Sequence, residues 1–338
     1  MRQSAPAANL AFSRNARTFE TVQSSLFVKS VAHACLGLIE VPDGPPCNPA
    51  FVPLQARARL GAEFLLSNGY PALQKMQQLL RGDIDQNLVD TLFSNQRVLQ
   101  IEGNAELNFY SKFLVSRYAP VSVKFFSVVR NEANPLIDLY AVQDQSMLLQ
   151  TGYKIGYGFS VGAQARQIQR KFIRRQFKLL DVATQTGRDR LKPKEQSLLY
   201  FEPSLGYKSS TTWPLTAGLM LVNLGTASVV YDELNEESQV QAGIALGAPI
   251  PYGQFRVMVD YKNLAPNEQE SEKFRVGAMY SFGAMNLGAG ADYNGLSWGL
   301  YYGVQQIHAG IMYSTTSTPW TNSDFYTQTV YLQVGWEI

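Results

Sequence analysis

The chain has 338 residues, and Asp, Glu, Lys and Arg make up only 17% of them, with a formal net charge of +2. Globular domains average about 25% charged residues, so a charge-rich soluble enzyme fits poorly, and the small net charge indicates no nucleic-acid partner. Mean hydropathy is −0.13, and no window approaches the roughly 18 uncharged apolar residues that a membrane-spanning helix needs. The abundance of Gly, Tyr and Phe is instead typical of a transmembrane β-barrel, in which apolar and polar residues alternate.

Residues 1–54 do not alternate, and we expect them to form a separate N-terminal segment. Residues 24–40 are apolar and rich in small side chains, which predicts a short helix, and a Pro- and Gly-rich bend follows at 42–46. No apolar signal-peptide core follows Arg2, so either a signal peptide has been cleaved or the protein is not exported. A barrel in the outer membrane requires the first, which is therefore our expectation. The segment is too short to be a domain, but the lumen of a wide barrel has room for it as a hatch.

Two cysteines, Cys35 and Cys47, lie twelve positions apart in this segment. In an oxidising compartment they could close a small loop, although two separate thiols fit the sequence equally well. The histidines His33 and His308 offer no metal-ligand spacing, and no Gly-rich nucleotide fingerprint is present. We therefore expect neither a metal nor a cofactor.

From residue 55 to residue 338, apolar and polar residues alternate in repeated segments, which predicts β-strands with one apolar face. The predicted strands are 55–66, 98–115, 119–130, 135–154, 157–168, 195–208, 213–223, 238–247, 251–262, 271–282, 284–293, 295–303, 305–315 and 325–338. An even number near fourteen is what a single-chain outer-membrane barrel requires. Together with the hatch, the pattern predicts an all-β, closed antiparallel transmembrane barrel of about fourteen strands in the outer membrane of a Gram-negative bacterium.

The predicted connections alternate between short turns and long loops, as expected for periplasmic turns and external loops. Short turns are expected at sites such as Tyr118–Pro120 and Gly156–Gly158, and two helices are expected in the long loop 67–97, over 71–80 and 84–93. The loop 169–194 carries a basic cluster of Arg170, Lys171, Arg174, Arg175 and Lys178. Facing outward, this cluster would bind lipopolysaccharide phosphates, whereas the alternative is a solvated basic helix.

The polar face of the strands is expected to line the lumen. It includes Arg57, Arg59, Glu63, Glu106, Lys112, Arg166, Glu202, Arg256, Asp260, Arg275 and His308. Both signs of charge occur, which favours ion pairs across the wall and with the hatch over direct roles in substrate passage. Because proline cannot donate to a strand ladder, we expect any gap in the wall next to Pro203 or Pro214.

An N-terminal segment that ends in Asn48-Pro49-Ala50 and leads directly into the first alternating strand resembles the FadL superfamily of outer-membrane proteins, which includes the PorV and TraF-like barrels. The resemblance implies fourteen strands around a lumenal hatch, with Asn-Pro-Ala near the junction. This sequence departs from the pattern of many such barrels at its C-terminus, where Ile338 stands in place of the usual terminal aromatic residue.

The resemblance implies passive uptake of a hydrophobic or amphipathic small molecule, such as a fatty acid, through the plugged lumen. The hatch residues expected to line its path are Leu26, Phe27, Val28, Val31, Leu36, Leu38, Ile39, Asn48, Pro49 and Phe51. The alternative, taken from the PorV side of the group, is a barrel that transports nothing and docks a secretion or surface-attachment partner at its external loops. An enzyme is not expected, because no motif links Ser160 or Ser204 to His308.

Overall fold

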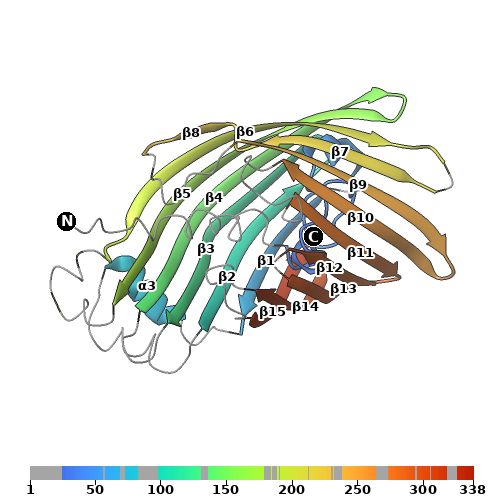
Figure 1. Ribbon diagram of the computed structural model, residues 1–338. Coiled ribbons are helices and arrows are strands. Elements are labelled where there is room, and N and C mark those ends of the chain that lie inside the picture. Colours follow the sequence, from blue (N-terminus) through green and yellow to red (C-terminus); the bar gives the residue numbers. More distant parts are fainter. Residues whose placement is uncertain are drawn as a thin grey trace, which may run out of the picture.

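The computed structural model describes residues 25–338 except 56–57, 69–72, 83–97, 131–135, 179–183, 185–188, 190, 212, 230, 232–237, 264–272, 294, 305 and 318–325. Within these ranges the chain is dominated by strands, and its helices are short (Figure 1). None of the described helices is long and apolar enough to cross a membrane.

In the described part of the chain, fifteen strands form a single antiparallel sheet that closes where β5 pairs with β6. Their bounds are β1 (Arg59–Ser67), β2 (Val98–Tyr110), β3 (Leu114–Arg130), β4 (Leu136–Gly156), β5 (Phe159–Lys178), β6 (Lys194–Lys208), β7 (Leu215–Val222), β8 (Gly225–Ala227), β9 (Gln239–Ile250), β10 (Gly253–Asn263), β11 (Phe274–Phe282), β12 (Met285–Asp292), β13 (Gly295–Val304), β14 (Ile307–Ser317) and β15 (Tyr326–Glu337). The predicted closed barrel is confirmed.

Strands β7 and β8 share one position in the wall, because both pair with β6. The chain interrupts its extended conformation between them at Asn223, whose φ is +59°, and the register with β6 shifts there. Counting this pair as one strand, the described sheet has fourteen positions around the barrel, as the alternation predicted.

The barrel is apolar on its outer surface, as β15 shows residue by residue. Tyr331 and Gln333 are 3% and 1% exposed, whereas their neighbours Leu332 and Val334 are each 57% exposed. Successive side chains of a strand point to opposite faces, so the exposed set faces outward and the buried set faces the lumen. Exposed Leu, Phe, Val and Trp side chains recur in this way on other strands around the wall. Such a surface suits contact with lipid.

The strands β2–β5 continue beyond the lipid-facing zone, and helix α3 (Leu73–Arg81) covers their outer face there (Figure 1). Met76, Leu79 and Leu80 of the helix pack in one buried cluster with side chains that include Ile137. Ile137 points outward, because it lies on the same side of β4 as the exposed Met147. Helix α3 therefore confirms the predicted helix over 71–80, while 84–93 lies outside the described residues.

Two predicted connections are wrong. The turn expected at Tyr118–Pro120 lies inside β3, where the pairing with β2 and β4 shifts around Ala119 as a bulge, because Pro120 has no N–H for the ladder. The actual turn is at 111–113, closed by hydrogen bonds between Ser111 and Leu114. Lys112 is consequently an exposed turn residue rather than a lumenal one.

The predicted start of the loop 169–194 is also wrong, because strand β5 continues to Lys178. Apolar-outward alternation ends near residue 165, since the strand leaves the lipid-facing zone, and the outward positions then become polar, as at Gln167 and Lys171. Because the outward positions become polar there, the alternation pattern places the end of this strand at residue 168 instead of Lys178.

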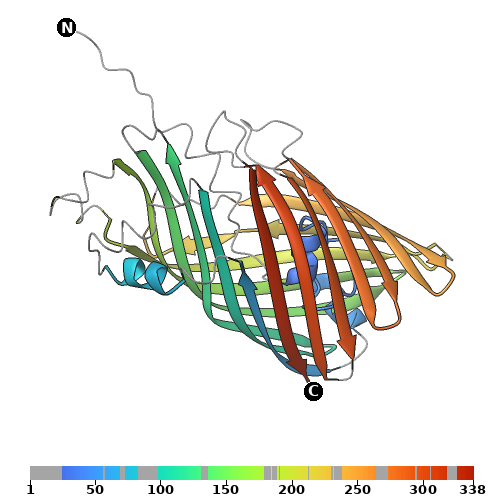
Figure 2. The ribbon, with the colours of Figure 1, turned by 90° about the horizontal axis from the view of Figure 1, so that it is seen from below.

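Residues 25–54, here called the plug segment, lie inside the barrel (Figure 2). They contain the five-residue helix α2 (Leu26–Ser30) and the 3-10 helix η2 (Pro49–Leu54), which contacts β4, β5 and β6. Helix α2 contacts β12–β15 on the other side of the lumen. The plug segment thus spans the interior from one side of the wall to the other.

Candidate functional site

Helix α2 of the plug segment is fixed at both ends by polar groups. Ser25 caps it by accepting a hydrogen bond from the Val28 N–H, and Asp43 accepts hydrogen bonds from the Ser25 hydroxyl and, at 2.8 Å, from the Phe27 N–H. Lys29 in its last turn forms a buried ion pair with Glu102 of β2, with Nζ 2.6 Å from Oε2. The ion pair attaches the helix to the wall, whereas the contacts of Ser25 and Asp43 lie within the plug segment.

A disulfide between Cys35 and Cys47 closes the middle of the plug segment into a loop. The carboxylate of Asp260 on β10 holds this loop, because its Oδ2 accepts hydrogen bonds from the Cys35 and Leu36 N–H groups at 2.8 and 3.0 Å. Thr216 of β7 donates to the carbonyl oxygen of Gly37 next to them. Two wall side chains therefore bind three consecutive residues of the plug backbone.

The end of the plug segment is bound to β6. Asn48 caps η2 by accepting from the Ala50 N–H and donates through Nδ2 to the Leu205 carbonyl oxygen at 3.0 Å. The Ser204 hydroxyl accepts from the same Ala50 N–H at 3.1 Å. Asn48 and Pro49 thus form the bend that leads toward β1.

Glycines in the wall allow the plug backbone to approach the strands. A Cβ atom on Gly162 of β5 would overlap Ala50 and Pro49, one on Gly218 of β7 would overlap the Leu36 carbonyl, and one on Gly290 of β12 would overlap Val31. The lumen is shaped around the plug segment, and larger side chains at these positions cannot coexist with it.

The predicted hatch path residues lie in this packed region. Nine of the ten predicted residues are buried, and Ile39 is half-buried. Five of them belong to one apolar cluster with the wall: Phe27, Val28, Val31, Leu36 and Leu38 pack together with Met220, Val222, Ala245, Met258 and Met279. The neighbouring plug residue Val41 belongs to the same cluster. In this structure these side chains fill the contact between plug and wall.

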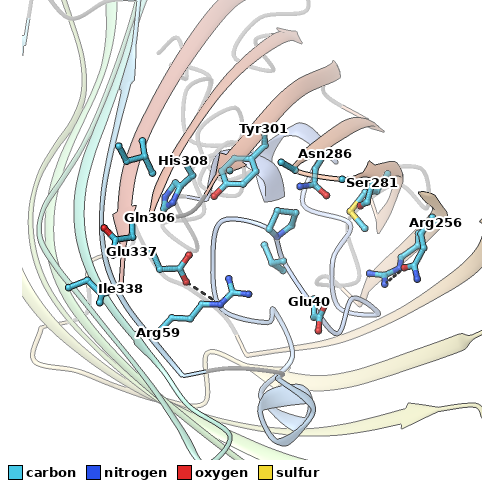
Figure 3. A pocket seen from close by; sticks show the side chains of 18 of the residues that line it. Glu40, Arg59, Arg256, Ser281, Asn286, Tyr301, Gln306, His308, Glu337 and Ile338 are labelled. Carbon is cyan, nitrogen blue, oxygen red and sulfur yellow. Dashed lines mark hydrogen bonds and ion pairs between the residues drawn. The ribbon is translucent and has the colours of Figure 1, made fainter. Parts of the chain in front are cut away.

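A polar cavity of about 570 Å³ lies beneath the plug segment at the rim that carries the short turns (Figure 3). Arg59 and Glu337 form an ion pair on one side, with Nε 3.1 Å from Oε1, and Arg256 lies on the other side, where it donates to Gln254. Val41 and Met279 contribute apolar surface to the same cavity. The cavity is thus an open vestibule with polar walls and a small apolar contact to the plug.

Next to this vestibule, charged side chains form a buried row across β14, β1, β2 and β3. His308 lies 3.7 Å from Glu63, Glu63 is directly opposite Glu106, and Glu106 is paired with Arg117. A cavity of about 30 Å³, the size of one water molecule, lies among Asp43, Glu63 and His308. Burial raises the pKa of the plug carboxyl Asp43 to about 6.

The predicted lumenal set is therefore placed as follows. Six of its residues are buried: Glu63, Glu106, Arg166, Glu202, Asp260 and His308. Two others, Arg59 and Arg256, line the vestibule, and Arg275 is half-buried. Lys112 is exposed in a turn, and Arg57 lies outside the described residues. Sequence reasoning missed Glu102 and Thr216, whose partners Lys29 and Gly37 lie in the distant plug segment. It also missed Asp43, whose partners Ser25 and Phe27 lie in the same segment but outside any local motif.

The basic cluster is divided between the two faces of β5 instead of lying together on an external loop. Arg170 points inward and forms a bidentate pair with Asp144 of β4, at 2.9 and 3.0 Å. Arg174 is also buried, while Lys171 and Arg175 are exposed on the outer face. Alternation along a strand causes this division.

The wall is irregular at Pro203, one of the two prolines singled out in the sequence. The β6–β7 ladder begins only at Ser204, and Glu202 accepts hydrogen bonds from the Asn223 N–H at 2.9 Å and from Arg166 at 3.1 Å. The side chain of Glu202 thus replaces ladder bonds at the interruption. At Pro214, by contrast, the carbonyl oxygen still accepts from the Gly247 N–H.

A closed wall with an apolar outer surface and a lumenal plug defines an outer-membrane β-barrel, and its place is the outer membrane of a Gram-negative bacterium. Among solved structures, the chain is similar to the toluene transporter TbuX of Ralstonia pickettii, with 10% identity, a TM-score of 0.50, and coverage of 91% of this chain and 97% of that one. The fold is FadL-like.

Two further similar structures are the CymD monoaromatic hydrocarbon channel, with 9% identity, a TM-score of 0.47 and coverage of 92% and 96% of the two chains, and the P. putida toluene transporter TodX, with 7% identity, a TM-score of 0.45 and coverage of 86% and 92%. No protein-family model and no curated protein sequence matches the chain.

Proposed function

We propose that this protein is a channel for the passive uptake of small hydrophobic molecules across the outer membrane. The observation that carries the proposal is the plug segment, which is packed against the wall through an apolar cluster and stands above a vestibule at the short-turn rim. A plug of this kind obstructs bulk water and ions, while its apolar contact with the wall favours uncharged solutes. The FadL-like fold, which TbuX shares, supports the same assignment.

The finer substrate assignment has two sources, a similar structure and the chemistry of the vestibule. The name of TbuX gives toluene as the solute of that protein, and toluene is our first candidate here. A fatty acid is the second candidate, because the Arg256 guanidinium in the vestibule can donate hydrogen bonds to its carboxylate.

The test is the initial rate of radiolabelled toluene uptake by Gram-negative cells with an intact lipopolysaccharide layer. Cells that produce the protein are expected to take up toluene faster than cells that carry the empty vector, and labelled oleate tests the second candidate in parallel. Equal rates with and without the protein, for both solutes, would refute the channel assignment.

The docking alternative is not put forward. In the described part of its two expected contact loops, helix α3 packs on the outer wall, and the whole basic cluster lies within β5 instead of in a loop. For lipopolysaccharide, we propose that the outward Lys171 and Arg175 and the exposed Lys178 contact its phosphates, since these side chains remain accessible. Reduced binding of purified lipopolysaccharide by the Lys171→Gln, Arg175→Gln variant would support this contact.

A further inference from the structure

The apolar contact between plug and wall has an unusual composition on the wall side. Three of its five wall residues are methionines, Met220 of β7, Met258 of β10 and Met279 of β11, and the other two are Val222 and Ala245. Methionine is unbranched and has three rotatable bonds, so it can rearrange without a change in the backbone. The wall side of this contact can therefore deform while the strands stay in place.

The methionines lie in an order that leads toward the vestibule. Met258 is directly opposite Ala245 in the ladder with β9, and Met279 is directly opposite Arg256 in the ladder with β11. Met279 belongs both to the apolar cluster and to the lining of the vestibule, and Val41 of the plug segment does so too. The apolar contact consequently opens into the vestibule between Val41 and Met279.

At the other end of this contact lie Met220 and Val222, next to the interruption of the wall at Asn223. Between the two ends, plug residues 35–37 are held to the wall by Asp260 and Thr216. The wall glycines Gly218 and Gly243 sit at this point and leave no unused space. The contact is thus closed in the structure by a short stretch of hydrogen-bonded plug backbone.

We infer that apolar solutes pass between the plug segment and the wall along Met220, Met258 and Met279 and enter the vestibule beside Val41. This inference rests on the proposed function and names its route. The three methionine side chains carry no charge, and their only weakly polar atom is sulfur, so a path along them favours uncharged solutes. Aromatic rings make favourable contacts with thioether sulfur, which makes a small aromatic hydrocarbon the class that fits the route best.

The first test replaces flexible methionine side chains with stiffer apolar ones of similar volume. In the Met258→Ile, Met279→Ile variant, branching at Cβ restricts side-chain rotation but suits a strand. Toluene uptake by producing cells is expected to fall about fivefold or more, a change in barrier of roughly 1 kcal/mol. The matched control is Met147→Ile, because Met147 faces outward from β4, and its uptake rate is expected to equal that of the wild type.

A second variant, Met258→Trp, fills the route with a rigid ring and is expected to abolish most of the uptake. Folding of each variant is checked by the heat-dependent electrophoretic shift of the barrel. If both Met258 variants are folded and transport toluene at the wild-type rate, the route is wrong while the channel assignment stands. If the wild type itself gives no uptake above the empty vector, the proposed function fails first.

Discussion

His308 of β14 reaches Glu63 of β1 across the intervening strand, because Gly335 of β15 has no side chain. Nε2 of His308 lies 3.7 Å from a Glu63 oxygen, and Gly335 is paired in register with both residues. A Cβ atom at position 335 would overlap the imidazole ring. The glycine therefore determines whether the two buried side chains can meet.

Gly335→Ala is expected to destabilise the barrel by about 1–3 kcal/mol, because the new methyl group displaces a buried ring. The measurement is the free energy of unfolding by urea in lipid vesicles. His308→Ala in the same background removes the overlapping ring, so the double variant should lose much less than the sum of the two single variants. Additive losses would show that the ring does not occupy the space over Gly335.

The wall glycines should control the position of the plug. Gly290→Val places a side chain where Val31 of the plug now lies, so the plug is expected to shift and to let ions through. The measurement is single-channel conductance in planar bilayers, and it should rise above that of the wild type. Ala289→Val is the matched control, because Ala289 is exposed on the opposite face of β12. Equal conductance in the two variants would mean that Gly290 does not seat the plug.

Removal of the Asp260 carboxylate should loosen the middle of the plug. In Asp260→Ala, the Cys35 and Leu36 N–H groups lose their shared acceptor, which costs about 2 kcal/mol and accelerates their hydrogen exchange roughly thirtyfold. Amide exchange of residues 35–37, measured by mass spectrometry, tests this. Asp260→Asn keeps one oxygen acceptor and should show a smaller effect. Unchanged exchange in the alanine variant would contradict the anchoring role.

Docking of the plug should weaken as the pH rises. Burial raises the pKa of Asp43 from 3.8 to about 6, so the docked plug binds a proton more tightly than a released one. The stabilisation is complete below about pH 3.8 and is lost as the pH rises through about 6. Protection of plug amides against exchange, after correction for the intrinsic rate, is expected to be greater at about pH 5 than at about pH 8. The same pH dependence in Asp43→Asn would contradict this origin.

The sequence predicts the wall of this barrel well because each strand separates lipid from lumen. Where Leu332 and Val334 face lipid while Tyr331 and Gln333 face the plug, the alternation is complete. The prediction fails where that separation ends. In β5 beyond residue 165, both faces meet polar or protein surroundings, so Arg170 and Lys171 look like a charged loop although they belong to one strand.

The candidate site was less predictable, because its contacts join residues far apart in the chain. Asp260 was predicted to be lumenal, but its backbone partners at 35 and 36 lie more than two hundred positions away. Lys29 and Glu102 form an ion pair that no local pattern indicates. The two cysteines allow only one pairing, but only the folded structure shows that they lie close enough to form the disulfide.

The arrangement of lipid-facing and lumen-facing side chains is tested most directly by nitroxide labels at two adjacent residues of β10. Phe255 is 37% exposed on the outer surface, and Gln254 lines the vestibule. In lipid vesicles, the label at 255 should collide mainly with dissolved oxygen, and the label at 254 mainly with a water-soluble nickel chelate. The reverse preference at the two positions would contradict the barrel described here.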